Sequence, residues 1–337
     1  MENLINSSPL PLVFLFLVAG FILLIKGADF FVDGSSSIAK KFKVPSIIIG
    51  LTIVAMGTSL PETAVSVTAS LAGRNELAIS NVTGSNIFNT MMVIGVCALL
   101  TPVMVQTETL KRDIPFSAFC ACILGVLGLL AFGDASDMTV GHIDGIILLV
   151  LFCGYIILLL RAALKSQKDA ESASGSMTDG APDEEEIKII PMWLACIYIV
   201  GGAAAIVFGG NLTVDSASRI ALSFGMSETL VGLTIVSIGT SLPELVTSVV
   251  AARKNEVDMA LGNAIGSNVF NILMVLGIAA AISPVTVRQE NLIDLAILLG
   301  FTVVVWIFAF TKRKISRIEG GAMVALYAAF AVYICIR

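Results

Sequence analysis

Charged residues are scarce in this sequence. Asp, Glu, Lys and Arg make up only 13% of its 337 residues, whereas a soluble globular protein carries about 25%. Hydrophobic residues account for 57%, and the mean hydropathy is +0.96. This composition excludes an ordinary soluble enzyme and a disordered chain. A net charge of −5 also argues against a nucleic-acid partner. The sequence therefore predicts an integral membrane protein.

Residues that commonly carry catalysis or bind soft metals are few. His142 is the one histidine, so a Ser/His or multi-histidine mechanism has little to build on. The six cysteines lie in apolar runs, and Cys120 and Cys122 lack the second pair that a zinc site needs. We expect the cysteines to be buried small hydrophobic residues. We predict neither an enzyme nor a bound cofactor.

Apolar runs separated by polar residues, Gly or Pro predict ten membrane-spanning helices. The expected ranges are 9–35, 44–70, 77–100, 113–132, 142–161, 191–217, 227–252, 259–282, 291–311 and 318–336. The stretch 162–190 is polar, rich in Ser and Gly, and then acidic, which is typical of a flexible linker. We therefore expect a first five-helix unit over 1–161, a cytoplasmic polar linker over 162–190 and a second five-helix unit over 191–337.

Basic residues predict the orientation. If the N-terminus lies outside, fifteen of the 20 Lys and Arg residues fall on the inner side and four on the outer side. Lys26 is the remaining one and lies within a span. We expect a multi-pass protein of the cell membrane (the inner or cytoplasmic membrane), with both termini outside.

An internal repeat is the clearest feature of the sequence. Residues 50–95 and 232–277 align at an offset of 182 without a gap, and 24 of the 46 positions are identical. Each half of the chain then holds five spans, and an odd number places the second half upside down. The expected fold is an all-α polytopic membrane protein of two inverted five-helix repeats. That plan is typical of secondary transporters, whose ion sites lie near the midplane between the halves.

Each repeat contains a proline inside a span. Pro61 has no N–H for the carbonyl of Gly57, so the helix must kink or unwind. A freed carbonyl is tolerated in a membrane only where it faces protein or a wet cavity, and it is a good ligand for a hard cation. Pro243 has the same relation to Gly239. A plain kink is the alternative, but the acidic residue after each proline favours an ion site.

Those acidic residues are Glu62 and Glu244. No Lys or Arg in the same runs neutralises them, so a cation, a proton or both must do so. Further oxygen donors share helix faces at spacings of four residues: Thr58, Glu62 and Ser66; Thr240, Glu244 and Ser248; Asn81, Ser85 and Asn89; Asn263, Ser267 and Asn271. Oxygen donors without sulfur or imidazole suit Na⁺ and Ca²⁺. Hydrogen bonding between helices is the alternative role for a single Ser or Asn.

The paired GTSLPE and GSNxFN blocks resemble the two alpha-repeats of the sodium/calcium exchanger family, in the cation/calcium antiporter superfamily, and specifically its compact bacterial and archaeal branch. The resemblance implies that Glu62 and Glu244 are the central Ca²⁺ ligands, aided by carbonyls near Thr58 and Thr240. It also implies four serines that complete sodium sites and two asparagines at the centre: Ser59, Ser85, Ser241, Ser267, Asn89 and Asn271.

By this resemblance the chain exchanges Ca²⁺ for Na⁺ by alternating access. A Ca²⁺/H⁺ antiporter of the same fold is the alternative. Some members of the family carry Asp at one of the two central positions, whereas this chain has Asn89 and Asn271, which leaves dependence on K⁺ or H⁺ open. A cation channel fits less well, since a channel needs a continuous pore that is usually built by several subunits. The expected partners are Ca²⁺, Na⁺ and the lipid bilayer, with no nucleic acid and no obligatory protein partner.

Overall fold

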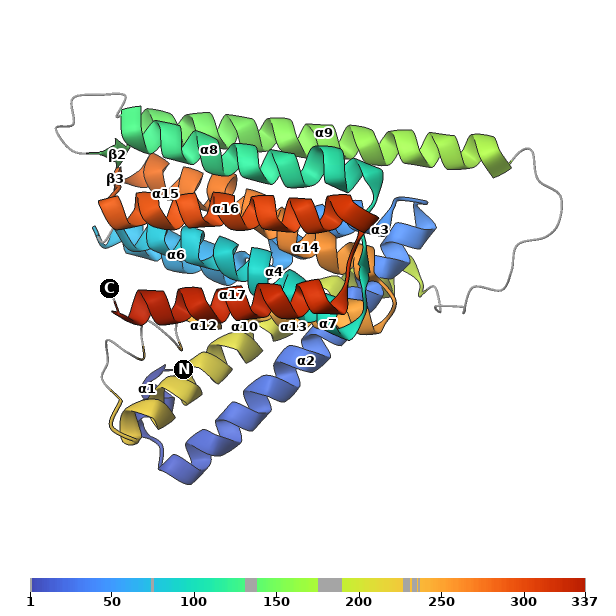
Figure 1. Cartoon of the computed structure of the whole chain (residues 1–337). Coiled ribbons are helices and arrows are strands. Elements are labelled where there is room, and N and C mark those ends of the chain that lie inside the picture. The colour runs from blue at the N-terminus through green and yellow to red at the C-terminus, as the bar shows by residue number, and fades with distance from the viewer. Residues whose placement is uncertain are drawn as a thin grey trace.

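The chain folds almost entirely into helices in the computed structural model (Figure 1), which describes residues 2–73, 76–130, 138–174, 190–226, 231, 235 and 237–336. The helices of the first half are α1 (Glu2–Ser7), α2 (Leu10–Lys41), α3 (Ser46–Ile49), α4 (Ala55–Thr58), α5 (Leu60–Leu71), α6 (Glu76–Phe88), α7 (Ile94–Leu100), α8 (Ile114–Leu130) and α9 (His142–Ser174). Those of the second half are α10 (Met192–Ser223), α12 (Ser237–Gly239), α13 (Leu242–Arg253), α14 (Val257–Phe270), α15 (Leu276–Ile282), α16 (Gln289–Lys312) and α17 (Arg317–Ile336).

Short π-helical turns and strands connect these helices. The π-helical turns are η1 (Gly50–Val54), η2 (Asn89–Val93), η3 (Thr109–Asp113) and η5 (Asn271–Val275). Strand β1 (Val103–Met104) pairs antiparallel with β4 (Lys314–Ile315), and β2 (Thr139–Val140) pairs antiparallel with β3 (Val285–Thr286). Both pairs join the first half of the chain to the second.

Eight helices of the described residues are long and apolar enough to cross a membrane: Leu10–Lys41, Glu76–Leu100, Thr109–Leu129, His142–Lys168, Met192–Ser223, Val257–Ile282, Gln289–Lys312 and Arg317–Ile336. The bent pair Ser46–Thr58 and Leu60–Leu71 makes a ninth if it is counted as one span. The remaining predicted span, 227–252, begins among residues that lie outside the described ones. Its last part is α13.

Three helices extend well beyond their predicted C-terminal ends, and one of them is α10, which ends at Ser223 instead of residue 217. Helix α2 continues from residue 35 to Lys41, and α9 continues from residue 161 to Ser174. The first part of the predicted linker is therefore helical, because Ala, Lys, Gln and Glu are good helix formers despite their polarity. Residues 175–189 lie outside the described part of the chain. The division into two units and a linker stays a prediction.

The offset of 182 reappears in the bounds of the elements. It maps α2 onto α10, α5 onto α13, η2 onto η5 and α7 onto α15, residue for residue. Helices α2 and α10 run antiparallel, since Gly20 lies against Thr213 and Gly34 lies against Ala195. These glycines let the two backbones approach closely, as small residues do in membrane helix pairs.

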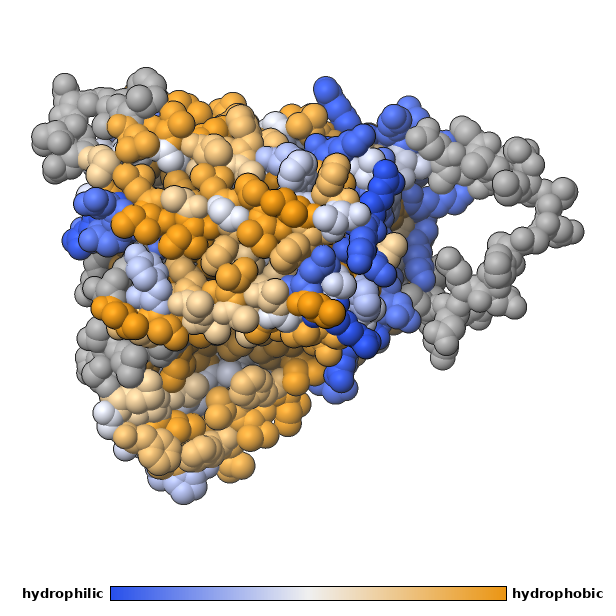
Figure 2. Space-filling view, viewed as in Figure 1, coloured by the Kyte–Doolittle hydropathy of each residue, from blue (hydrophilic) through white to orange (hydrophobic). Residues whose placement is uncertain are grey.

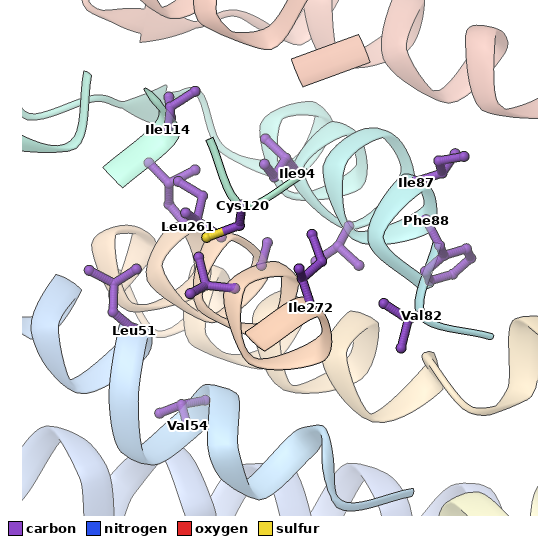
Figure 3. Packing of buried hydrophobic residues seen from close by; sticks show 14 of the residues in the cluster. Leu51, Val54, Val82, Ile87, Phe88, Ile94, Ile114, Cys120, Leu261 and Ile272 are labelled. Carbon is purple, nitrogen blue, oxygen red and sulfur yellow. The ribbon is translucent and has the colours of Figure 1, made fainter. Parts of the chain in front are cut away.

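The interior is built around the two helices that carry the GSNxFN blocks. In the most apolar 18-residue stretch of Glu76–Leu100 and of Val257–Ile282, 78% is buried inside the protein. The corresponding share in α17 is 17%. Figure 3 shows residues of this buried cluster, with Leu261 of α14 beside Cys120 of α8, and Leu51, Val54 and Ile94 contributed by other segments. The repeat helices are thus shielded from lipid by the other spans.

The outer surface is largely apolar. Figure 2 shows hydrophobic residues over the flank of the molecule and hydrophilic ones gathered at the end where α9 leaves the bundle. Cys122, Cys153, Cys196 and Cys335 are exposed, so the expectation of burial was wrong for these four. In a membrane protein an apolar run also covers the lipid-facing surface, so hydropathy alone does not separate the two locations.

Candidate functional site

The helix breaks that the prolines predicted are present in both repeats. Helix α4 ends at Thr58 and α5 begins at Leu60, with a bend of 48° between the two helical segments. In the second repeat α13 begins at Leu242 after the non-helical Ser241. Pro61 and Pro243 occupy the first turns of α5 and α13, where a missing N–H costs least.

Each break places a carboxylate at the start of a helix. Glu62 lies in the first turn of α5 and Glu244 in the first turn of α13. Both side chains are fully buried, with 0% exposed. The N-terminal end of a helix carries a partial positive charge, which stabilises a nearby anion. This contribution is well below a full unit charge, so the two buried carboxylates still need a cation or protons.

Serines of each half contact the carboxylate of the other half. Ser59 donates to Oε1 of Glu244 at 3.1 Å, and Ser241 donates to Oε1 of Glu62 at 3.3 Å. Ser85 also donates to Oε1 of Glu62 at 3.3 Å and accepts from Ser241 at 2.9 Å. The structure thus brings five of the predicted residues into two hydrogen-bonded groups between the halves, which together we call the network.

The predicted threonines lie at the edges of this network. Thr58 donates to Oδ1 of Asn263 at 3.0 Å, and its Oγ1 lies 3.5 Å from Oγ of Ser267. Thr240 is only partly buried and donates to Oδ1 of Asn81 at 3.5 Å. Asn81 and Asn263 in turn donate to the backbone carbonyls of Glu62 and Glu244. These two asparagines hold the helix faces that carry the glutamates.

The two central asparagines have different surroundings. Asn271 donates from Nδ2 to Oδ1 of Asn86 at 3.1 Å, and Asn86 donates to the carbonyl of Asn268 at 3.1 Å. Neither amide atom of Asn89 has a hydrogen-bond partner among the described residues, although Asn89 is fully buried. The sequence pattern treated the pair as equivalent. Among the described residues, both amide atoms of Asn89 are without a hydrogen bond, whereas the amide nitrogen of Asn271 is bonded to Asn86.

The sequence interpretation missed Asn86 and Asn268. Each directly follows the serine of a GSNxFN block, so the signal was present in the motif. Grouping donors at spacings of four residues placed them off the face that carries Ser85 and Ser267. In the structure Asn86 reaches across to α14 instead.

Several buried oxygens of the site have no hydrogen-bond partner within the described residues. They are Oε2 of Glu62, Oε2 of Glu244, Oδ1 of Asn89 and Oδ1 of Asn271. Burying a charged oxygen without a partner costs several kcal/mol. Carboxylate, hydroxyl and amide oxygens are the ligands of hard cations such as Na⁺ and Ca²⁺. The donor set therefore fits a hard cation.

Residues 12–161 and 194–336 match the family described as sodium/calcium exchanger protein. This chain belongs to that family. The stretch between the two matched segments is 162–193, and the sodium/calcium exchanger match covers most of both halves.

Two known proteins of similar sequence are named as an antiporter and an exchanger. The chain is 37% identical to the putative antiporter CaxA of Alkalimonas amylolytica, over 94% of this chain and 96% of that protein. It is 33% identical to the sodium/calcium exchanger MaX1 of Methanosarcina acetivorans, over 95% of this chain and 97% of that protein. A solved structure of the sodium-calcium exchanger NCX_Mj superimposes with a TM-score of 0.78 at 32% identity, covering 95% of this chain and 98% of that one. The sodium/calcium exchanger chain described here thus shares a polytopic membrane fold with NCX_Mj.

Proposed function

We propose that this chain is an antiporter that exchanges Ca²⁺ for Na⁺ across a membrane by alternating access. The observation that carries the proposal is the pair Glu62 and Glu244, each fully buried, each contacted by a serine of the other half, and each with one carboxylate oxygen unpartnered. The names of MaX1 and NCX_Mj support Na⁺ and Ca²⁺ as the exchanged ions.

Charge counting supports exchange. Two carboxylates balance one Ca²⁺ or about two Na⁺, so the ions compete for overlapping oxygens. Loading with Ca²⁺ or with Na⁺ removes the cost of bare charge in the membrane. The loaded protein then switches between its inward-open and outward-open states. The empty protein keeps two unbalanced buried charges, which opposes that change. Ion movement in one direction is thereby coupled to movement in the other.

The proposed ligand set follows from the network. Glu62 and Glu244 bind Ca²⁺ with carbonyls near the helix breaks, and the surrounding oxygens complete Na⁺ sites. The full set is Thr58, Ser59, Glu62, Ser85, Asn89, Thr240, Ser241, Glu244, Ser267 and Asn271. We place Thr240 at its periphery because it is partly exposed and bonds to Asn81.

We further propose ten spans in two inverted five-helix repeats, in the cell membrane with both termini outside. The element bounds that follow the offset of 182 and the antiparallel packing of α2 with α10 support the inversion. The basic residues that gather on the linker side support the orientation. The bilayer is the one partner that this arrangement requires.

Cysteine labelling tests this topology. In a background without the six native cysteines, the thiol of Lys165→Cys should react with a membrane-impermeant maleimide only from the cytoplasm. The thiol of Glu290→Cys should react only from outside. Both side chains are exposed, and the proposed topology puts them on opposite sides of the membrane. Reaction of both thiols from the same side would contradict the ten-span inverted arrangement.

A flux measurement separates Na⁺ exchange from the alternatives. Proteoliposomes loaded with Na⁺ should take up ⁴⁵Ca²⁺ in Na⁺-free and K⁺-free buffer, with a protonophore present. Equal Na⁺ on both sides should abolish uptake. Uptake driven equally well by a proton gradient without Na⁺ would support the Ca²⁺/H⁺ alternative. Unsaturable uptake with no counter-ion would support a channel.

Asn89 provides a test of ion choice. Asn89→Asp should make Na⁺-driven Ca²⁺ flux more sensitive to pH or weaken it, because a third carboxylate beside Glu62 and Glu244 attracts an extra proton or cation. The measurement is flux across a pH series in potassium-free buffer. Asn86→Asp, at a position already bonded to Asn271, is the comparison. A wild-type flux that vanishes without K⁺ would show that the central amides do not set the coupling ion.

A further inference from the structure

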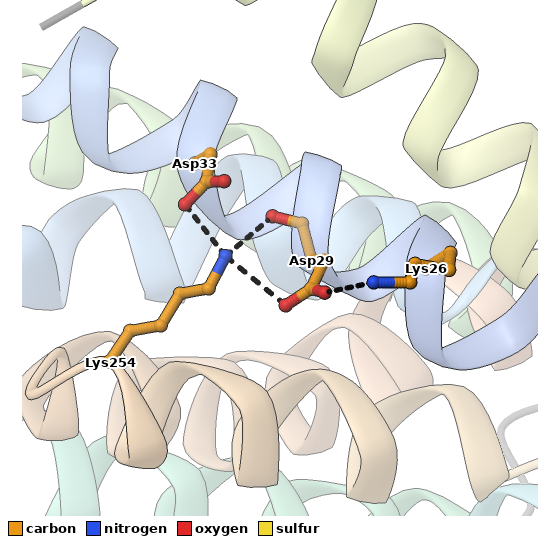
Figure 4. Close-up of polar contacts among 4 residues, drawn as sticks. All are labelled: Lys26, Asp29, Asp33 and Lys254. Atoms are coloured by element: carbon orange, nitrogen blue, oxygen red, sulfur yellow. Dashed lines mark hydrogen bonds and ion pairs between the residues drawn. The ribbon is translucent and has the colours of Figure 1, made fainter. Parts of the chain in front are cut away.

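A charged contact joins α2 to the end of α13. Lys254 directly follows α13 and donates from Nζ to Oδ1 of Asp33 at 2.7 Å and to the carbonyl of Asp29 at 3.0 Å (Figure 4). Nζ also lies 3.2 Å from Oδ1 of Asp29. Three oxygens thus surround an ammonium that has three N–H bonds. Lys26 adds a weaker ion pair, 3.5 Å from Asp29. We call Lys254, Asp29 and Asp33 the α2 clasp.

The clasp lies toward the linker-side end of the span. Asp33 and Asp29 precede the basic end of α2 at Lys41 by roughly two and three helical turns. Charges at such depth in a membrane helix need partners. The side chains of Lys254, Asp29 and Asp33 are 30%, 33% and 43% exposed, so all three are partly shielded from solvent. Separating α2 from α13 would therefore leave charges without their partners.

Helix α13 links the clasp to the cation site. It carries Glu244 in its first turn and ends directly before Lys254, and its 12 residues form a rod about 18 Å long. Helix α2 also lies against the site, because Phe31 packs on Gly57 next to Thr58. The clasp thus fixes α13, which carries Glu244, against α2, which covers the helix break beside Glu62.

The same contact cannot form in the other repeat. The offset of 182 places Ala72 where Lys254 stands and Asn211 where Asp29 stands. Neither residue carries a charge. In a transporter built from two related halves, a contact that is made in only one conformation favours that conformation. The α2 clasp exists in one half only, and in the proposed topology it lies on the linker side of the membrane.

We propose that Lys254 is a positioning residue that holds α2 closed against α13 on the linker side. The clasp favours the conformations in which the site does not open to that side. Its loss raises the fraction of protein that is open toward the linker side. The assignment rests on the proposed antiport by alternating access, and its test is arranged so that the two can fail separately.

Ser36 is a suitable reporter of this opening. It is three residues after Asp33 and seven after Asp29, so it lies on the same face of α2, nearer the linker side. Its side chain is 2% exposed, and its hydroxyl has no hydrogen-bond partner among the described residues, so a cysteine there removes no such bond. The rate of reaction of Ser36→Cys with an impermeant maleimide reports access from the linker side without any transported ion.

The experiment compares three substitutions in the Ser36→Cys protein without native cysteines, in everted vesicles. Lys254→Met should raise the labelling rate about fivefold, in line with the loss of partly exposed ion pairs. Lys254→Arg should restore the wild-type rate because it keeps the charge. Arg253→Met is the matched control, because Arg253 is exposed and this substitution removes the same charge at the same helix end. Equal labelling of Lys254→Met and wild type, or an equal rise in Arg253→Met, would overturn the proposal.

Flux supplies a second readout. In Lys254→Met the Na⁺ concentration for half-maximal flux should fall about threefold to fivefold at the linker face and rise less than about twofold at the other face. A purely structural defect would lower the maximal rate and leave this ratio unchanged, which would contradict the proposal. If wild type shows no Na⁺-driven flux, the antiport proposal fails, while the labelling rates still decide whether the clasp closes α2.

Discussion

Glu62→Gln and Glu244→Gln are each expected to abolish Na⁺-driven Ca²⁺ flux. Each carboxylate is fully buried, and the serines that contact it carry no charge that could replace it. Losing one partner of a buried ionic contact costs roughly 3–5 kcal/mol, or a factor of about 100 or more in binding. The measurement is initial ⁴⁵Ca²⁺ uptake into proteoliposomes at saturating Na⁺ gradient.

The glutamine variants should still fold. Removing a bare buried charge relieves its desolvation cost, so thermal unfolding in detergent without cations should occur at the wild-type temperature or above. Glu108→Gln is the matched control, because Glu108 is an exposed carboxylate outside the network, and its flux should stay at wild type. Wild-type uptake by Glu62→Gln or by Glu244→Gln would show that the substituted glutamate is not part of the ion site.

Gly202→Ala is expected to destabilise the packing of α2 on α10. A methyl group on Gly202 would lie 2.8 Å from both the carbonyl oxygen of Gly27 and the backbone N of Phe31. Backbone atoms of two long helices cannot yield as a flexible side chain can. Overpacking of this kind costs about 1–3 kcal/mol, so we expect a lower unfolding temperature in detergent and reduced flux.

Gly201→Ala is the matched control for this prediction. Gly201 is the neighbouring residue on α10, is exposed, and has no described atom within 4 Å of an added methyl group. Alanine also has a higher helix propensity than glycine. Gly201→Ala should therefore be as stable as wild type or slightly more stable. Equal destabilisation of both variants would show that the close approach of α2 and α10 does not limit stability.

The sequence predicted the long helices well because hydropathy and span length are properties of single segments. The predicted ranges 77–100 and 259–282 differ from the structure by one or two residues. The ends of α2 and α9 were placed too early, because the polar residues that continue these helices carry no hydropathy signal. The π-helical turns at Asn89–Val93 and Asn271–Val275 were not predicted either, since backbone register is set by packing between helices.

The site was predictable where a rule of covalent chemistry applied. Pro61 and Pro243 cannot donate a hydrogen bond, and both helices break beside them. The contacts between halves, such as Ser59 to Glu244, depend on how two distant segments meet, which a single sequence does not report. The inequality of Asn89 and Asn271 has the same origin, because it depends on which partners surround identical residues in the two repeats.

Equilibrium binding of ⁴⁵Ca²⁺ to the purified protein tests the central claim most directly. If Glu62 and Glu244 form one site that Ca²⁺ and Na⁺ share, the wild type should bind Ca²⁺ and release it as Na⁺ is added, with a Hill coefficient above 1 for Na⁺. Glu62→Gln and Glu244→Gln should each lose this binding, while Glu108→Gln keeps it. Ca²⁺ binding that Na⁺ does not displace, or that survives in both buried variants, would contradict the account.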